Sequence, residues 1–343
     1  MHIKSKGLIL ITVLSFTIIS ISFYVYQILR TANFQIGKPD IYFYIPTGAK
    51  FKQVLDSLKK KRIVHDEVSF AFLSKLLNYQ DNVKPGRYLI RRNANNWEVV
   101  QMLRKGLQTP INISFHNIRL KKDLIKAIAK ELEFSEQELA NILKDNTKLA
   151  KYGFDSTTVM AMFLPNTYQV YWNISAQSFV DRMYKEYQNF WTKERRQKAQ
   201  ELGLTPIQVS ILASIVQAET TKEDEKPRIA GVYINRLRKN MRLEADPTVV
   251  FAHQNFNLKR VLKSHLEIDS PFNTYRYPGL PPAPINLPTT RSIEAVLNYE
   301  KHNYMFFCAK DDFSGYHNFA VTSAEHNRNA QLYHRALALR GIR

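Results

Sequence analysis

An uninterrupted apolar run occupies most of the first thirty residues. From Gly7 to Leu29 no residue is charged, Lys4 and Lys6 precede the run, and Arg30 follows it. As a helix the run would extend about 34 Å, enough to cross a hydrocarbon core of roughly 30 Å. The pattern predicts a single-pass anchor over 7–29 in the cell (inner) membrane. Residues 1–6 would stay cytoplasmic, and the rest of the chain would be periplasmic or extracytoplasmic.

A cleavable signal peptide is the alternative interpretation of this run. Its apolar core is normally shorter, and Thr31-Ala32-Asn33 is a poor match to a small-residue cleavage site. We therefore favour an uncleaved anchor. Residues 30–40 are mostly polar, which predicts a short linker after it.

The hydrophobic period changes after this segment. Residues 41–45 alternate as a strand, and apolar positions at 51, 54, 55 and 58 predict a helix. A helix over 66–77, a strand over 87–90 and a helix ending near Gly106 complete a compact α+β module over 41–110. Residues 111–158 predict a connector or second small α+β unit, with helices near 123–132 and 135–145.

The pattern over the remaining residues, 159–343, predicts a mixed α/β domain. The predicted fold class of the whole chain is α+β, with an α+β module followed by this mixed domain. Apolar periodicity predicts helices over 176–200, 206–219, 227–239 and 291–300, a strand over 304–309, and a last helix from Ser323. Residues 270–290 are rich in proline, which prevents regular structure throughout. A long irregular segment of this kind is often a binding surface.

The helix predicted over 206–219 carries the candidate chemistry. Ile207, Ile211, Ile215 and Glu219 recur every fourth residue. A carboxylate that ends an aliphatic stripe lies at the rim of the core, where desolvation raises its pKa. A carboxylic acid that is protonated near neutrality can act as a general acid. Periodicity alone leaves the other interpretation open, in which the stripe leaves the core and Glu219 is solvated.

Composition narrows the remaining possibilities. The formal net charge is +19 and is spread along the chain, which fits a generally basic surface or attraction to an acidic polymer, anionic lipid or nucleic acid. The single cysteine, Cys308, excludes an intrachain disulfide. No metal-ligand spacing or nucleotide-binding loop occurs, so no metal or other cofactor is expected. His317 fits a site residue or a core histidine, and the mixed-charge residues 222–226 are typical of a solvated run.

Several motifs, in order and at matching spacing, resemble the MltG/YceG-like family of endolytic murein transglycosylases. They are LASIVQAET (212–220), AGVYINRL (230–237), MRLEADPTV (241–249) and NTYRYPGLPP (273–282). Residues 41–110 resemble the LysM-like module of that family. The segment 160–168 departs from the pattern, since it lacks the family's leading glutamate and its aspartate.

The resemblance implies cleavage of MurNAc–GlcNAc bonds within the glycan strands of peptidoglycan, leaving 1,6-anhydroMurNAc ends. One glutamate would act first as acid and then as base. Glu219 is the catalytic candidate, because the family's other acid in this motif is Gln217 here. The matched motifs give these substrate-binding candidates: Tyr168, Asn235, Arg236, Asp246, Thr248, Ser270, Asn273, Thr274 and Tyr275.

The resemblance also suggests a link to cell-wall synthases (penicillin-binding proteins) and a role in terminating nascent strands. A non-catalytic peptidoglycan-binding scaffold that recruits those synthases is the alternative function. Nucleic acid is not an expected partner, because the anchor places the chain outside the cytoplasm.

Overall fold

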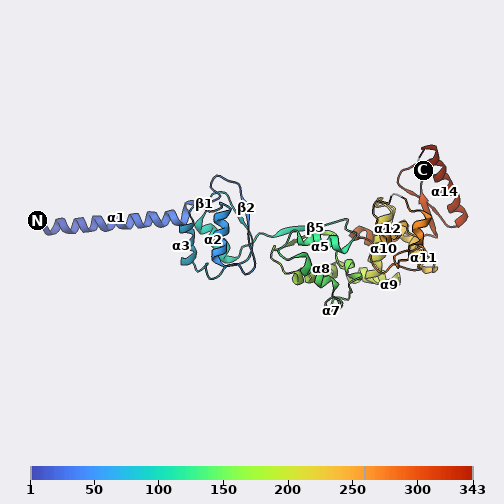
Figure 1. Ribbon diagram of the computed structural model, residues 1–343, viewed down its shortest axis with the longest axis horizontal. Coiled ribbons are helices and arrows are strands. Elements are labelled where there is room, and N and C mark those ends of the chain that lie inside the picture. The colour runs from blue at the N-terminus through green and yellow to red at the C-terminus, as the bar shows by residue number, and fades with distance from the viewer. Residues whose placement is uncertain (1, 259, 342–343) are drawn as a thin grey trace. The chain divides into compact units, whose positions relative to one another are not determined.

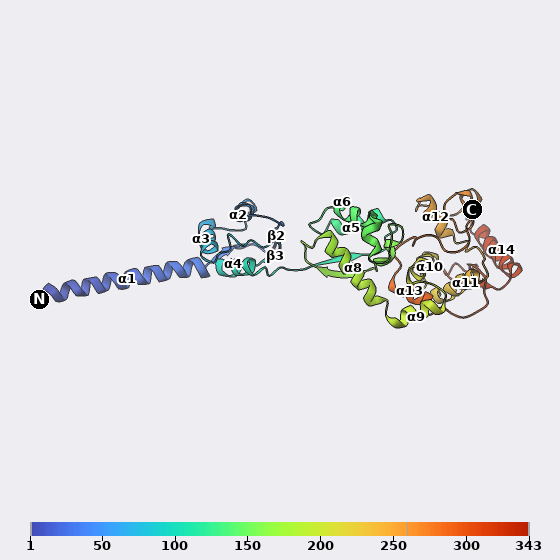
Figure 2. The same ribbon diagram turned by 90° about the horizontal axis from the view of Figure 1, so that it is seen from below.

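The computed structural model describes residues 2–258 and 260–341 and divides into two compact units (Figures 1 and 2). Among these residues, the first unit comprises those up to Ile113 with the short segments 131–133 and 169–174, and the second comprises the others. Helices dominate both units, and the strands form two-stranded sheets. The predicted mixture of helix and strand is therefore confirmed.

Helix α1 (His2–Arg30) opens the first unit. Its segment Gly7–Arg30 has a mean hydropathy of 2.4 and none of its most apolar stretch is buried by the protein. The helix is long and apolar enough to cross a bilayer, as predicted for an anchor.

The linker predicted over 30–40 is wrong for the residues that directly follow α1. Strand β1 (Ala32–Phe34) pairs with β4 (Ala94–Asn95), and Phe34 is fully buried. Asn33 is also buried, because its side chain exchanges hydrogen bonds with the backbone of Asp66 and donates to Asn96. These partners satisfy a polar residue that made the segment look solvated.

The rest of the first unit is a small α+β module. Strand β2 (Ile41–Ile45) pairs antiparallel with β3 (Gly86–Ile90), and α2 (Phe51–Lys60) and α3 (Glu67–Leu76) lie between them in the chain. Helix α4 (Asn96–Lys105) ends at Gly106, whose φ of 70° suits glycine. All the elements predicted over 41–106 are confirmed. Their apolar faces form one core around Phe34, Phe43, Leu58, Phe70 and Tyr88.

The middle of the chain carries short elements and one helix break. Its elements are β5 (Ile111–Phe115), α5 (Lys121–Ala129), α6 (Glu136–Lys144), α7 (Asn146–Ala150), η1 (Thr158–Met162), β6 (Asn166–Val170), α8 (Ala176–Phe190) and α9 (Lys193–Glu201). The single helix predicted over 176–200 is wrong. Thr192 has an extended backbone and accepts from the N–H of Arg195, so it caps α9 as a new helix.

Helix α10 (Pro206–Glu219) is the central helix of the second unit, packed against α11 (Lys226–Arg238), α12 (Asp246–His253) and α13 (Thr290–Leu297) (Figure 2). Its start is confirmed, with a Thr205–Gln208 capping box and Pro206 in the first turn. Every residue from Val209 to Val216 is buried. This stretch, which includes Ser210 and Ser214, is thus buried on all sides, where the sequence predicted a single apolar stripe.

The proline-rich segment after the short helix η2 (Lys263–Glu267) has no helix or strand up to Thr289, as predicted. It is nevertheless well packed, since Asn273, Thr274, Ile285 and Leu287 are buried. The chain ends with an antiparallel hairpin, β7 (Phe306–Ala309) and β8 (His317–Ala320), and helix α14 (Ser323–Leu339).

Candidate active site

Glu219 is the last residue of α10 and lies at the edge of the apolar core. Its side chain is partly buried, and both Val216, about one helical turn earlier, and the next residue, Thr220, are buried. Burial raises the pKa of Glu219 to about 7, and the charge of Asp246 contributes in the same direction. The hydrogen bond from Tyr233 and the charge of Arg236 act in the opposite direction. Both protonation states of this carboxyl are therefore accessible near neutral pH.

Tyr233 is the direct partner of this carboxyl. Its hydroxyl donates to Oε1 of Glu219 over 2.5 Å, and its ring packs edge-on against Phe307. Because Oε1 accepts this bond, the proton of the neutral carboxyl is carried by Oε2. Within residues 2–258 and 260–341, Oε2 makes no hydrogen bond. Tyr233 was not singled out from the sequence, although it lies within the AGVYINRL motif.

Two predicted contact residues, Asp246 and Tyr275, lie beside this pair. Asp246 begins α12 and is exposed, and the hydroxyl of Tyr275 donates to its Oδ1 over 2.6 Å. Burial, together with this bond and the charges of Asp246 and Glu219, raises the pKa of Tyr275. The structure thus brings together one acid with a raised pKa, one exposed carboxylate and two tyrosines.

Three other predicted contact residues are buried and hold the proline-rich segment in place. The hydroxyls of Thr248 and Thr274 lie 2.8 Å apart, and that of Thr248 donates to the carbonyl of Ala245. The Asn273 amide donates to the carbonyls of Leu266 and Ile268 at 2.8 and 2.9 Å. Their polar groups are occupied by the protein, so these residues support the segment that carries Tyr275.

Asn235 and Arg236 are similarly engaged with backbone. The Asn235 amide donates to the carbonyls of His302 and Tyr304. The buried guanidinium of Arg236 donates to the carbonyl of Met305 at 2.6 Å and to Glu244 at 2.9 Å. Arg236 reaches the site through its charge, which favours ionised Glu219.

The last two predicted contacts, Ser270 and Tyr168, have local partners. Ser270 Oγ accepts from the N–H of Phe272, and the buried Tyr168 hydroxyl donates to the carbonyl of Leu164 at 2.6 Å. Neither hydrogen-bonds to Glu219, Tyr233 or Asp246 in the described parts of the chain.

Glu225 corrects the prediction of a solvated run after α10. Glu223 and Asp224 are exposed, but Glu225 is buried. Its carboxylate accepts from the backbone N–H of His317 at 2.8 Å, lies 2.7 Å from Nδ1 of that residue, and accepts from Thr220 at 3.4 Å. The partner is 92 positions away, beyond the reach of local patterning. Glu225 thus ties the residue after Glu219 to strand β8.

Gln217 occupies the position where the family motif has its other acid. Its Nε2 donates to Asn286 and to the carbonyl of Leu287, both at 3.1 Å. Its Oε1 accepts from the N–H of Thr289 at 2.6 Å and from Ser292 at 3.0 Å. The side chain therefore fastens α10 to the proline-rich segment and α13. A carboxylate here would lose both donated bonds.

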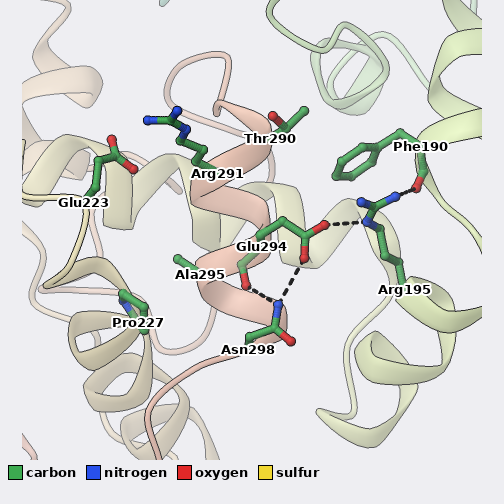
Figure 3. Close-up of a pocket in the computed structure, with 9 residues that line it drawn as sticks. All are labelled: Phe190, Arg195, Glu223, Pro227, Thr290, Arg291, Glu294, Ala295 and Asn298. Atoms are coloured by element: carbon green, nitrogen blue, oxygen red, sulfur yellow. Dashed lines mark hydrogen bonds and ion pairs between the residues drawn. The ribbon is translucent and has the colours of Figure 1, made fainter.

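A pocket of about 560 Å³ lies elsewhere in the second unit (Figure 3). Figure 3 shows Glu294 joined to Arg195 on one side and to Asn298 on the other. Neither Glu219, Tyr233 nor Asp246 lines it. The candidate site consists of the carboxyl groups of Glu219 and Asp246 and the two tyrosines that hydrogen-bond to them. This pocket is separate from that site.

Comparison with known proteins adds independent information. The sequence model of the protein family described as "YceG-like family" matches residues 43–332 of this chain. An endolytic murein transglycosylase of Bacillus subtilis (strain 168) is 28% identical over 313 residues, which cover 87% of this chain and 86% of that protein. One from Streptococcus pneumoniae serotype 2 (strain D39) is 26% identical over 320 residues, covering 83% of this chain but 57% of that protein. The chain thus spans little more than half of the pneumococcal relative.

A solved structure is also similar. The 2.6 Å crystal structure of a YceG-like protein from Listeria monocytogenes superimposes with a TM-score of 0.55 at 26% identity. The match covers 84% of this chain and 98% of that one. The similarity therefore extends through both units.

Proposed function

Since the chain belongs to the YceG-like family, we propose that it is an endolytic peptidoglycan transglycosylase, a lyase that cleaves MurNAc–GlcNAc bonds within glycan strands. The observation that carries the proposal is the position of Glu219 at the rim of the apolar core and against the Tyr233 hydroxyl, where burial raises its pKa to about 7. A carboxyl that is neutral near physiological pH can deliver a proton to a glycosidic oxygen. A scaffold that only binds glycan has no use for such a group.

In the first step, neutral Glu219 protonates the glycosidic oxygen as the bond from C1 of MurNAc to that oxygen breaks. The bond that Tyr233 donates to Oε1 leaves Oε2 as the proton-bearing oxygen. The electron pair of the broken bond stays with the GlcNAc hydroxyl, which leaves neutral. The developing positive charge on the MurNAc ring lies near two carboxylates, Glu219 and Asp246.

In the second step, the ionised Glu219 accepts the proton of the MurNAc 6-hydroxyl as O6 bonds to C1. This closes the 1,6-anhydro ring and regenerates neutral Glu219, so protons balance over the cycle. One carboxyl serves as acid and then as base, which agrees with the replacement of the second motif acid by Gln217.

For the remaining candidates we propose two kinds of role. Asp246 and Tyr275 contact substrate at the rim, because Asp246 is exposed and Tyr275 is only partly buried. Tyr168, Asn235, Arg236, Thr248, Ser270, Asn273 and Thr274 shape or support the cleft through the protein bonds described above.

We also propose that α1 anchors the enzyme in the cell membrane, with the part of the chain that follows Arg30 on the extracytoplasmic side. The Lys4 and Lys6 charges before the apolar run support this orientation. The β–α–α–β order of β2, α2, α3 and β3, with its outer strands paired, supports a LysM-like glycan-binding module. Such an enzyme would meet nascent strands near membrane-bound cell-wall synthases and could terminate their elongation.

The full chain, purified in detergent, should release products with 1,6-anhydroMurNAc ends from isolated sacculi, detected by mass spectrometry. Glu219→Gln should lower the rate by roughly 100- to 10,000-fold, the usual contribution of acid–base catalysis. Glu136→Gln, at an exposed glutamate of α6, is the matched control and should keep full activity.

Two outcomes would contradict the proposal. Hydrolysed reducing ends in place of anhydro ends would show that water is the nucleophile. Tight binding to sacculi with no anhydro product from the unaltered chain would favour the non-catalytic scaffold.

A further inference from the structure

Helix α3 of the first unit has two apolar faces. Phe70, Leu73 and Ser74 are buried in the module core. On the opposite side, Val68, Phe72 and Leu76 follow one another at intervals of four and are 74%, 57% and 66% exposed. At 100° per residue this second stripe lies about 150° from the core face. A surface helix normally carries polar residues on the face away from the core. An exposed apolar stripe on that face therefore indicates contact with an apolar partner.

The position of α3 within its unit indicates what that partner is. Both views show α3 at the end of the module nearest α1 (Figures 1 and 2), and the two helices are in contact. Because the core lies on one side of α3, the exposed stripe faces away from the module. The stripe is thus carried by a helix at the end of the module where α1 joins it.

The anchor joins the module without a spacer. Ile28 is part of the module core and Leu29 packs against it. The buried amide of Asn96 donates to the carbonyl of Ile28 at 2.9 Å, and β1 begins at Ala32. The apolar run ends at Leu29, so a span of α1 across the hydrocarbon core brings this junction to the bilayer surface.

We propose that α3 lies in the interfacial layer of the membrane, with Val68, Phe72 and Leu76 inserted among the lipid acyl chains. The proposal rests on the anchoring proposed for α1. It makes the module a second membrane contact, which fixes its orientation on the bilayer and with it the face presented to glycan.

Neighbouring residues fit the same environment. Trp97 directly follows Asn96, which hydrogen-bonds to Ile28 of α1, and is 38% exposed. Tyr24 and Tyr26 are exposed on α1 near its C-terminal end. Tryptophan and tyrosine are enriched at the membrane interface. Arg30 and Lys75 are exposed beside the apolar residues and can pair with anionic headgroups.

Spin labelling of the full chain tests this placement. In a Cys308→Ser background, single cysteines at Phe72, Leu76, Leu14 and Leu107 are labelled with a nitroxide. Each protein is reconstituted at one chain per nanodisc of phosphatidylethanolamine and phosphatidylglycerol. Collisions with oxygen and with a water-soluble nickel chelate are then compared. Leu14 lies within α1, and Leu107 is an exposed control past the end of α4 remote from Asn96.

Labels at 72 and 76 should show an oxygen-to-nickel ratio several-fold above that at 107 and approaching that at 14. If the label at 14 is lipid-protected while 72 and 76 match 107, the anchor stands and the α3 proposal fails. If the label at position 14 itself collides freely with the nickel chelate, both the anchoring proposed for α1 and the placement proposed for α3 fail. Protection at 72 that appears only in discs with two chains would assign the stripe to a second copy and overturn the proposal.

Discussion

The hydroxyl of Tyr233 donates to Oε1 of Glu219 over 2.5 Å, linking α11 to the last residue of α10. This bond favours the ionised carboxylate, whereas burial and the charge of Asp246 favour the neutral acid. The balance leaves the pKa of Glu219 at about 7. The hydrogen bond from Tyr233 and the charge of Asp246 can each be removed by a single substitution, so their opposite effects on the pKa of Glu219 can be measured separately.

The activity of the unaltered chain should depend on one ionisation on its alkaline side. The proposed reaction begins with neutral Glu219, so kcat/KM should be level below its pKa and fall tenfold per pH unit well above about 7. Initial rates of anhydro-product release between pH 5 and 9 check this. A profile that rises through pH 7 would mean that ionised Glu219 starts the reaction.

Tyr233→Phe should move this decline to higher pH. The substitution removes a hydrogen bond that lowers the pKa of Glu219 while the surrounding burial remains. The midpoint of the pH–rate profile is the measurement. An unchanged midpoint with a lower rate at every pH would indicate that Tyr233 serves only to pack the site.

Asp246→Asn should move the decline in the opposite direction. The charge of Asp246 raises the pKa of Glu219, and asparagine removes the charge while its oxygen can still accept from Tyr275. The midpoint should therefore fall below that of the unaltered chain. A change in the Michaelis constant without a shift in midpoint would limit Asp246 to substrate contact.

Glu219→Gln should stabilise the protein in a pH-dependent way. Below pH 4.5 the glutamate is neutral in both folded and unfolded states, so the variant gains nothing. From 4.5 to about 7 the unfolded state ionises first, which destabilises the folded state until the effect becomes constant above pH 7. The gain should reach about 3 kcal/mol at most, given roughly 1.4 kcal/mol per unit of pKa. Thermal unfolding at pH 4, 6 and 8 checks the sign, and a gain that shrinks with rising pH would contradict it.

Glu225→Ala should destabilise the second unit by about 3 kcal/mol. It leaves the backbone N–H of His317 and the ring of that residue without their buried acceptor. Asp224→Ala, at the exposed neighbouring acid, should change the free energy of unfolding by only about 0.5 kcal/mol. Urea titrations of both variants give the comparison, and equal effects would show that the burial of Glu225 adds no stability.

Local patterning was sufficient for most elements of the fold. Apolar periodicity over 206–219 predicted α10, and the helix predicted to end near Gly106 is α4. These signals act between residues a few positions apart, so no tertiary information was needed. The break between α8 and α9 was missed because a threonine within an amphipathic pattern fits a helix interior as well as a cap.

The sequence by itself determined that the chain has a long apolar N-terminal helix, a small α+β module and a helix that ends in Glu219. It also left Glu219 as the one acidic residue in the 212–220 motif, because the family's other acid is replaced there by Gln217. Only the tertiary structure decided the chemistry around it, by placing Tyr233, Asp246 and Tyr275 beside Glu219 and burying Glu225 against His317. The physical reason is that desolvation and hydrogen bonding depend on which distant segments surround a side chain. Periodicity reports only the face on which that side chain lies.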